Sequence, residues 1–309
     1  MPRIPRLLVD GEEAVYHVIS RTALDGYVLG SDDKEYLVHL IKWLSGVFFV
    51  KIFGYCIMSN HFHLLLKVSP GRELSDEEVL RRAKIYYDNI QGKQQVVPTY
   101  IDRYRERFSN LSEFVKEIKQ RFSRYYNKKY GRRGYFWGDR FKSVLIEEGE
   151  ALLNCLAYIE LNPVRAGIVK RPEEYRWCSL AYLVATGNRS GFICTDYGLA
   201  TTREPAFQEF LALLRAFIYE KGGMKIDGGR EIPHDILEQE RKKGFRPSKK
   251  RLFLMKIRYF SDSGILGSRA YVRAQYERFR RLFRSKEKVP KRVPGIEGVY
   301  SLKRLTVNV

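Results

Sequence analysis

The stretch that decides the fold runs from Ser59 to Val68 and reads SNHFHLLLKV. Successive side chains of a strand point to opposite faces, so His61 and His63 share one face while Phe62 lies on the other. Two imidazoles side by side on a strand provide part of a metal site or a catalytic pair. The pair is equally compatible with two histidines satisfied by local hydrogen bonds, and the motif alone does not separate the two interpretations.

The segments before this stretch predict the first half of a sheet-and-helix unit. Residues 47–58 read as an apolar strand, which a turn at Ser59-Asn60 joins to the histidine strand. Further upstream, residues 14–21 alternate as a strand, and residues 31–44 carry apolar side chains at helical spacing after capping residues. A strand, a helix and a hairpin form the first half of a ferredoxin-like βαββαβ fold.

The segments after the stretch complete this pattern. They predict a helix over 111–130, a strand over 142–147 and an extra helix over 151–161 that Pro163 ends, followed by an aromatic, loop-rich part up to about residue 191. We therefore predict the α+β class: a ferredoxin-like βαββαβ core with an antiparallel sheet, and a helical basic C-terminal region. Residues of about 70–110 are expected to be a surface insertion.

Charge and composition favour a nucleic-acid partner. The 309 residues carry a formal net charge of +20, and most of the excess lies after residue 240. A basic, aromatic-rich chain is typical of nucleic-acid binding. We predict a catalytic domain over 1–185 and a mainly helical, basic DNA-binding extension over 186–309. The absence of a long apolar run or secretory signal, together with four scattered cysteines, predicts a cytoplasmic protein with no membrane partner.

A second motif, about a hundred residues after the histidines, supplies a nucleophile. Tyr158 and Asn162 are four residues apart on a predicted helix and so share a face. A tyrosine phenolate can attack phosphorus and hold the product as a covalent ester. A divalent ion held by His61, His63 and an oxygen ligand such as Asn162 would polarise the phosphate. The alternative is that Tyr158 is a packing residue and that Asn162 precedes a proline at a helix end.

Three motifs in order resemble a known family. HFH at 61–63, RFKS at 140–143 and YIELNPVRAGIV at 158–169 are similar to those of single-tyrosine HUH transposases, most of all the REP-associated tyrosine transposases. The resemblance covers roughly residues 3–183. It implies Mg²⁺ or Mn²⁺ as cofactor, His61 and His63 as metal ligands, and Tyr158 as the nucleophile. Because many relatives have glutamine where Asn162 stands, its role as a ligand is less certain.

The resemblance also implies partners. These are single-stranded DNA with hairpins and, in relatives that dimerise, a second copy of the chain, so monomer and homodimer both stay open. Aromatic residues interleaved with cations suit single strands, whose bases stack and whose phosphates pair with positive charge. Candidate DNA contacts are Arg21, Arg124, Asn127, Arg132, Arg133, Trp137, Arg140 and Lys142.

Three other functions compete with strand cleavage and transfer through a 5′-phosphotyrosine. The chain could be a non-catalytic DNA-binding or regulatory protein on the same fold. It could be an RNA-binding sheet protein, because that class shares the predicted core. A metal-independent phosphoesterase would need a second histidine motif, whereas His17, His39 and His234 stand isolated in the sequence.

Overall fold

The fold is taken from a computed structural model of the whole chain. The structure describes residues 8–9, 11–89, 95–198, 205–224, 229–247, 266–278, 280, 288–292 and 300–302. Within these ranges, no helix is both long and apolar enough to cross a membrane.

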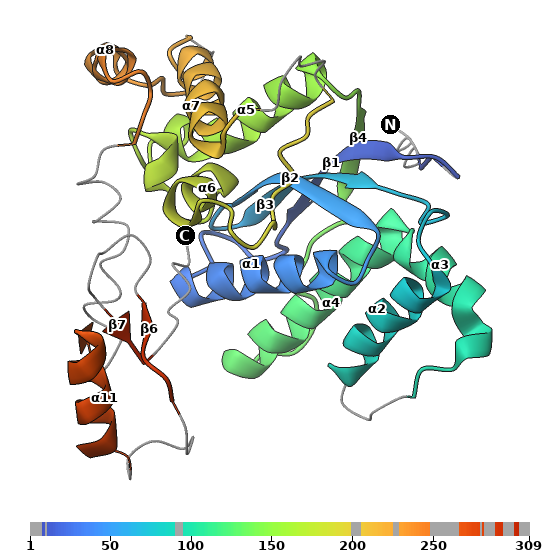
Figure 1. Cartoon of the computed structure of the whole chain (residues 1–309). Helices are drawn as coiled ribbons and strands as arrows, with labels where there is room; N and C mark the ends of the chain where they lie inside the picture. The colour runs from blue at the N-terminus through green and yellow to red at the C-terminus, as the bar shows by residue number, and fades with distance from the viewer. Residues whose placement is uncertain are drawn as a thin grey trace.

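The central sheet has four antiparallel strands. β1 (Ala14–Arg21), β2 (Val50–Ile57), β3 (His61–Val68) and β4 (Lys142–Ile146) pair in the order β2-β3-β1-β4 (Figure 1). With α1 between β1 and β2 and helices between β3 and β4, this order is that of the ferredoxin-like βαββαβ core. The predicted fold class is confirmed.

Two long helices cover one face of the sheet. α1 (Ser31–Ser45) and α4 (Leu111–Lys129) pack against each other and against this face (Figure 1). Phe62 of β3 points toward them, and its ring lies 5.3 Å from that of Trp137, which in turn lies 5.5 Å from Phe122 of α4. The histidines that flank Phe62 therefore lie on the opposite face of the sheet.

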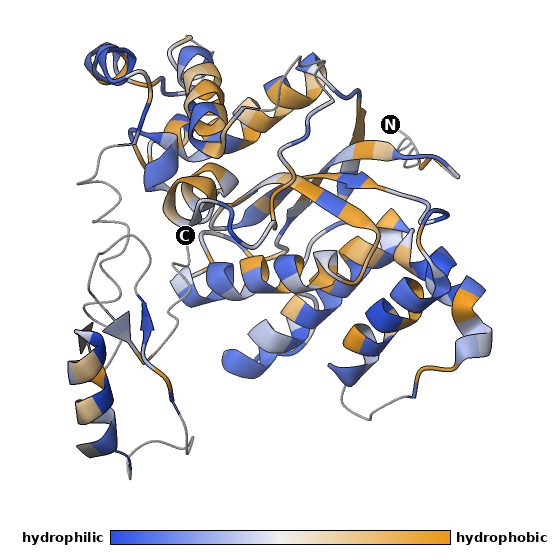
Figure 2. Ribbon diagram, in the orientation of Figure 1, coloured by the Kyte–Doolittle hydropathy of each residue, from blue (hydrophilic) through white to orange (hydrophobic). Residues whose placement is uncertain are grey.

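The opposite face is covered by α5 (Glu150–Arg165) and α6 (Ser179–Thr186). α5 is the predicted extra helix, but it continues past Pro163 to Arg165 rather than ending before it. α6 lies in the part that the sequence predicted as loop. Its side chains from Ser179 to Ala185 are all buried, so it lacks the amphipathic periodicity that marks a surface helix. In Figure 2, α6 is largely hydrophobic in colour, whereas α2 and α8 are mostly hydrophilic.

The predicted insertion is helical and packs on the core. It contains α2 (Asp76–Asp88), a 3-10 turn (Pro98–Tyr100) and α3 (Ile101–Phe108). Phe108 is fully buried, with its ring 5.3 Å from that of Phe48. The insertion thus extends the hydrophobic core at the end of the sheet away from His61.

Part of the C-terminal region packs on α5. α7 (Phe207–Gly222) contacts α5, and α8 (His234–Lys242) contacts α7. Arg215 of α7 is fully buried, and its Nη2 lies 2.6 Å from Glu173 and 2.9 Å from Glu240 of α8. Further along are α11 (Arg269–Arg278) and a small sheet of β5 (Leu266–Gly267), β7 (Tyr300–Ser301) and β6 (Lys291–Arg292). Residues 248–265 of the predicted basic extension lie outside the described residues.

Candidate active site on the histidine face of the sheet

The two motif histidines begin β3. Their ring centroids are 5.0 Å apart, and the rings are nearly perpendicular. His61 Nδ1 lies 2.7 Å from Asn60 Oδ1, so the adjacent turn residue orients this ring. The predicted common face of His61 and His63 follows directly from the pleat of the strand.

A third histidine joins them from the neighbouring strand. His17 of β1 pairs in register with Leu65, which lies two residues after His63 on β3. Paired residues share a face, so His17 lies on the same face as His63. Its Nε2 is 2.9 Å from His63 Nδ1, and the two rings are stacked with centroids 5.2 Å apart. The sequence analysis missed this residue, because its proximity depends on the pairing of β1 with β3. The one local signal was the alternation of residues 14–21, which places His17 and Arg21 on one face.

Burial keeps these imidazoles neutral. It lowers the pKa of His17 to about 4 and that of His63, where the neighbouring histidines add to the effect, to about 3. Burial also lowers the pKa of His61, with a further contribution from the positive charge of Arg21. Neutral imidazoles have a ring nitrogen lone pair with which to bind a metal ion.

Tyr158 approaches the histidines from α5. Its ring centroid lies 5.8 Å from that of His63 and 6.0 Å from that of His17, edge-on in both cases. The side chain is 42 % exposed, although α5 buries the residues on either side of it, Ala157 and Ile159. The guanidinium carbon of Arg165 lies 5.4 Å from the centre of the Tyr158 ring. The structure thus brings together a phenol open to solvent, three imidazoles and a positive charge.

The histidine pair suits a divalent ion. Hydrogen bonding occupies Nδ1 of both His61 and His63, so Nε2 of each ring is the nitrogen that could bind a metal. A hydrogen bond at the other ring nitrogen is the usual way in which a protein orients a histidine ligand. In the described ranges, no three His, Cys, Asp or Glu side chains are placed to hold an ion together. An ion held by this pair would therefore take further ligands from an amide, water or substrate oxygens.

Asn162 has a structural role within α5, in addition to its predicted role as a metal ligand. Its side-chain amide donates to the Tyr158 carbonyl at 3.0 Å and to the Ile159 carbonyl at 3.3 Å. Pro163 has no N–H to donate to the Ile159 carbonyl, so the Asn162 amide replaces the lost helical hydrogen bond. This explains why α5 continues through Pro163. Both of these hydrogen bonds use the amide nitrogen of Asn162 and go to carbonyls of α5 itself. The amide oxygen of Asn162 remains available as an acceptor.

Three tyrosines of α4 and its C-terminal end, which could compete with Tyr158 as nucleophile, are not placed for the same chemistry. Tyr125 and Tyr130 donate to the buried carboxylate of Asp33 at 3.3 and 2.8 Å, and Tyr126 donates to the Val28 carbonyl at 3.2 Å. All three belong to the layer of α1 and α4, on the other side of the sheet from the histidines. Of these four tyrosines, Tyr158 is therefore the one beside the imidazoles.

Several predicted DNA contacts surround the histidine face. Arg21 pairs in register with His61, and Lys142 of β4 is on the same face because both it and His63 pair with Ile19. Both are exposed, and so are Arg132, Arg133 and Arg140 in the loop that leads from α4 to β4. Arg124 is exposed on α4 and so lies in the other layer.

Two further predicted contacts, Trp137 and Asn127, make contacts within the fold. Trp137 is only 6 % exposed, its ring is packed between Phe62 and Phe122, and its Nε1 donates to the Lys119 carbonyl at 2.9 Å. A ring in this position cannot stack on a base, so this prediction is corrected. The side-chain amide of Asn127 donates to the Gly134 carbonyl at 2.9 Å and thereby holds the 131–134 turn.

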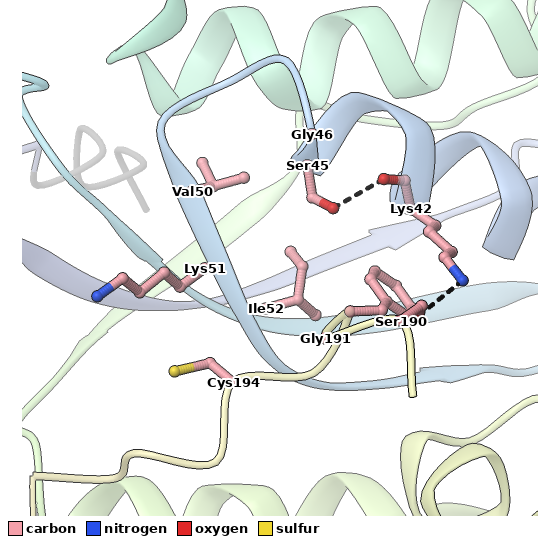
Figure 3. Close-up of a pocket in the computed structure, with 10 residues that line it drawn as sticks. Lys42, Ser45, Gly46, Val50, Lys51, Ile52, Ser190, Gly191 and Cys194 are labelled. Atoms are coloured by element: carbon pink, nitrogen blue, oxygen red, sulfur yellow. Dashed lines mark hydrogen bonds between the residues drawn. The ribbon is translucent and has the colours of Figure 1, made fainter. Parts of the chain in front are cut away.

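A small cavity elsewhere in the protein does not belong to this site. It has a volume of about 250 Å³ and is lined by Val50, Ile52, Ser190 and others, with Lys42 donating to Ser190 Oγ at 2.9 Å (Figure 3). Val50 pairs with Val68, at the end of β3 opposite His61. The histidine site lies at the other end of β3, where Tyr158 and Arg21 are exposed to solvent.

One comparison with known proteins matches part of the chain to a family. Residues 12–90, from β1 to the end of α2, match the family model of the IS200-like transposases. The resemblance to transposases predicted from the sequence is confirmed over this part, which includes the histidine motif and His17. A solved structure of a REP-associated tyrosine transposase bound to a REP hairpin is 16 % identical, with a TM-score of 0.41, covering 67 % of this chain and 99 % of the other. That similarity is too low to support an argument. No similar protein was found among curated proteins.

Proposed function

We propose that the protein cleaves and rejoins single-stranded DNA that carries hairpins, through a 5′-phosphotyrosine intermediate at Tyr158. The observation that carries the proposal is the position of this exposed phenol, 5.8 Å from the His63 ring, on a face that also presents Arg21 and Lys142. The match of residues 12–90 to a transposase family supports the reaction class.

The proposed chemistry is a transesterification. The Tyr158 oxygen attacks phosphorus and the bond from phosphorus to the 3′ oxygen breaks. The phenol proton passes to water, and the leaving 3′ oxygen takes up a proton from water to become a 3′-hydroxyl. Rejoining is the reverse reaction, with the 3′-hydroxyl of another strand as the attacking group. The covalent ester conserves the bond energy, so no nucleotide cofactor is needed.

Residues of this chain hold the reacting groups. His61 and His63 would bind Mg²⁺ or Mn²⁺ through Nε2, with Asn162 as the proposed oxygen ligand, and the ion would supply electrophilic stabilisation of the phosphate. Arg165 adds positive charge next to the phenol. Arg21 and Lys142, together with Arg132, Arg133, Arg140 and, in the other layer, Arg124, would neutralise phosphates along the strand.

Covalent capture tests this function. Wild-type protein, labelled single-stranded hairpin DNA from sequences flanking its own gene, and Mn²⁺ should give a protein–DNA adduct on denaturing gels. Tyr158→Phe should abolish the adduct, and EDTA should prevent its formation. The matched control is Tyr130→Phe, which removes a phenol from the other layer and should leave the adduct intact.

Two outcomes would contradict the proposal in different ways. An adduct that survives in Tyr158→Phe would show that another residue is the nucleophile. A wild-type protein that binds the DNA and never forms an adduct would favour the non-catalytic DNA-binding function on the same fold.

A further inference from the structure

Two loops meet at the end of the sheet beside His61. One connects β1 to α1 (residues 22–30) and the other connects α4 to β4 (residues 130–141). Ala23 N donates to the Phe136 carbonyl at 2.9 Å, and Gly138 N donates to the Arg21 carbonyl at 2.9 Å. Thr22 N also donates to the Asn60 carbonyl at 2.9 Å, which ties this pair of loops to the turn before the histidines.

One buried tyrosine contacts both loops. The Tyr126 hydroxyl donates to the carbonyl of Val28 in the first loop, and its ring lies 4.3 Å from that of Phe136 in the second. Trp137 is buried beside them. The loops therefore have a packed aromatic base and a fixed backbone.

Each loop presents a highly exposed tyrosine directly beside these anchor points. Tyr27, next to Val28, is 85 % exposed, and Tyr135, next to Phe136, is 91 % exposed. Among the large hydrophobic side chains of the described residues, these two are the most exposed. Folding gains little from two rings left in water, whereas rings on a fixed backbone lose little freedom when a flat partner binds.

The surroundings of the two rings favour a polyanion. Arg132 and Arg133 are exposed three and two residues before Tyr135, and Arg21 is exposed next to the start of the other loop. Asp25 and Asp139 are the acidic residues of the two loops, against the cations Arg132, Arg133 and Arg140 within them. Exposed rings beside cations suit unpaired nucleotides, whose bases stack and whose phosphates pair with positive charge. Duplex DNA is a poorer fit, because its bases are already stacked within the helix.

We propose that Tyr27 and Tyr135 form a stacking platform for unpaired bases of single-stranded DNA, next to the histidine face. This inference rests on the proposed function, because the DNA strand bound by these two tyrosines would be the one presented to Tyr158. It assigns a base-binding role to two residues from different loops. One of these residues, Tyr27, does not belong to any of the sequence motifs.

A binding experiment tests the platform separately from catalysis. The full chain carrying Tyr158→Phe is titrated into labelled oligothymidylate, into the same oligomer containing 2-aminopurine, and into duplex DNA. Adding Tyr27→Ala or Tyr135→Ala should weaken single-strand binding by roughly 5- to 100-fold each, the effect of losing one base–aromatic stack. Duplex binding should stay within about twofold, since it depends on phosphate contacts.

Matched variants separate stacking from other effects. Tyr27→Phe and Tyr135→Phe keep the rings and should retain single-strand affinity and the quenching of 2-aminopurine. Tyr100→Ala removes another exposed tyrosine, which lies in the insertion, and should change nothing. Thermal unfolding checks that each variant is folded.

The outcomes distinguish the two proposals. Alanine variants that bind single strands as tightly as the parent protein would overturn the platform even if wild type forms the Tyr158 adduct. A parent protein that prefers duplex to single strands would overturn it as well. Ring-dependent single-strand binding without any adduct in wild type would support the platform and count against the proposed catalysis.

Discussion

Arg165 and Tyr158 lie two turns apart on α5, with the guanidinium over the phenol ring. In the proposed reaction, a positive charge in this position would stabilise the charge that develops on the attacked phosphate. The sequence alone indicated the motif that contains both residues. Their contact follows from the helical period, which places residues seven apart on the same face.

We predict that Arg165→Ala slows adduct formation by roughly 10²-fold, comparable to the loss of one electrostatic donor to a transition state. Arg165→Lys should recover part of the rate, because it keeps the charge and most of the stem. The measurement is the single-turnover rate at saturating DNA. A normal rate combined with weaker DNA binding would show that Arg165 acts on affinity alone.

Glu160 lies on the buried side of the same helix. It accepts hydrogen bonds from the Ser179 hydroxyl and, at 2.9 Å, from Leu180 N at the start of α6, while its Oε2 is buried without a partner among the described residues. Burial raises the pKa of the Glu160 carboxyl to about 8. The native state therefore holds this proton at neutral pH, while the unfolded chain, with the ordinary value of 4.5, releases it.

Unfolding should thus release a proton from Glu160 between about pH 4.5 and pH 8, so its contribution to stability is complete below this window and is lost as the pH rises through it. Glu160→Gln should flatten the dependence of the urea midpoint on pH across the window. Glu150→Gln, at an exposed position of α5, serves as the control. Parallel pH profiles for wild type and Glu160→Gln would contradict the prediction.

At the scale of elements, the position of α5 depends on a glycine in β2, whose missing side chain leaves room for the helix. Gly54 follows an irregularity in the β2–β3 register, and a Cβ placed there would lie 2.3 Å from Leu156 Cδ1 and 3.0 Å from Ser179 Oγ. The glycine lets α5 and α6 approach the sheet closely. This contact belongs to tertiary packing, and the sequence shows only a glycine in an apolar strand.

Gly54→Ala should lower the free energy of unfolding by roughly 1–3 kcal/mol through overpacking. Because the helix that it displaces carries Tyr158, the rate of adduct formation should also fall. Urea denaturation and single-turnover cleavage measure the two effects. Gly191→Ala changes a glycine with open space around it, and although its positive φ adds some strain, it should leave the rate of cleavage unchanged. Normal stability and normal cleavage in Gly54→Ala would contradict the packing argument.

At the scale of the molecule, a buried charge network joins the C-terminal helices to the core. Arg215 of α7 bridges Glu173 and Glu240, and Tyr219 donates to Glu173 at 2.9 Å. Since α7 also packs on α5, the first helices of the predicted DNA-binding extension support the helix that carries Tyr158. The predicted division at residue 185 remains a prediction about function, since these contacts cross it.

Replacing Arg215 with Leu should lower the free energy of unfolding by about 3–5 kcal/mol, because the buried Glu173 and Glu240 each lose an ion pair, although Glu240 keeps its pair with Arg171 at 2.6 Å. The control is Arg241→Ala, whose ion pairs with Glu220 and Glu238 are exposed and should contribute at most about 1 kcal/mol. Chemical denaturation of both variants provides the measurement. Equal losses of unfolding free energy in the two variants would show that the buried charge network does not stabilise the protein.

The sequence by itself determined the strands, the antiparallel βαββαβ core and the pairing of His61 with His63 on one face, because each of these follows from local periodicity. Tertiary structure alone decided which residues join them. His17 arrives through the register of β1 with β3, Trp137 is taken into the core by Phe62 and Phe122, and α5 continues through Pro163 with help from the Asn162 amide. The physical reason is that periodicity assigns a side chain to a face, whereas contacts between distant segments decide what that face meets.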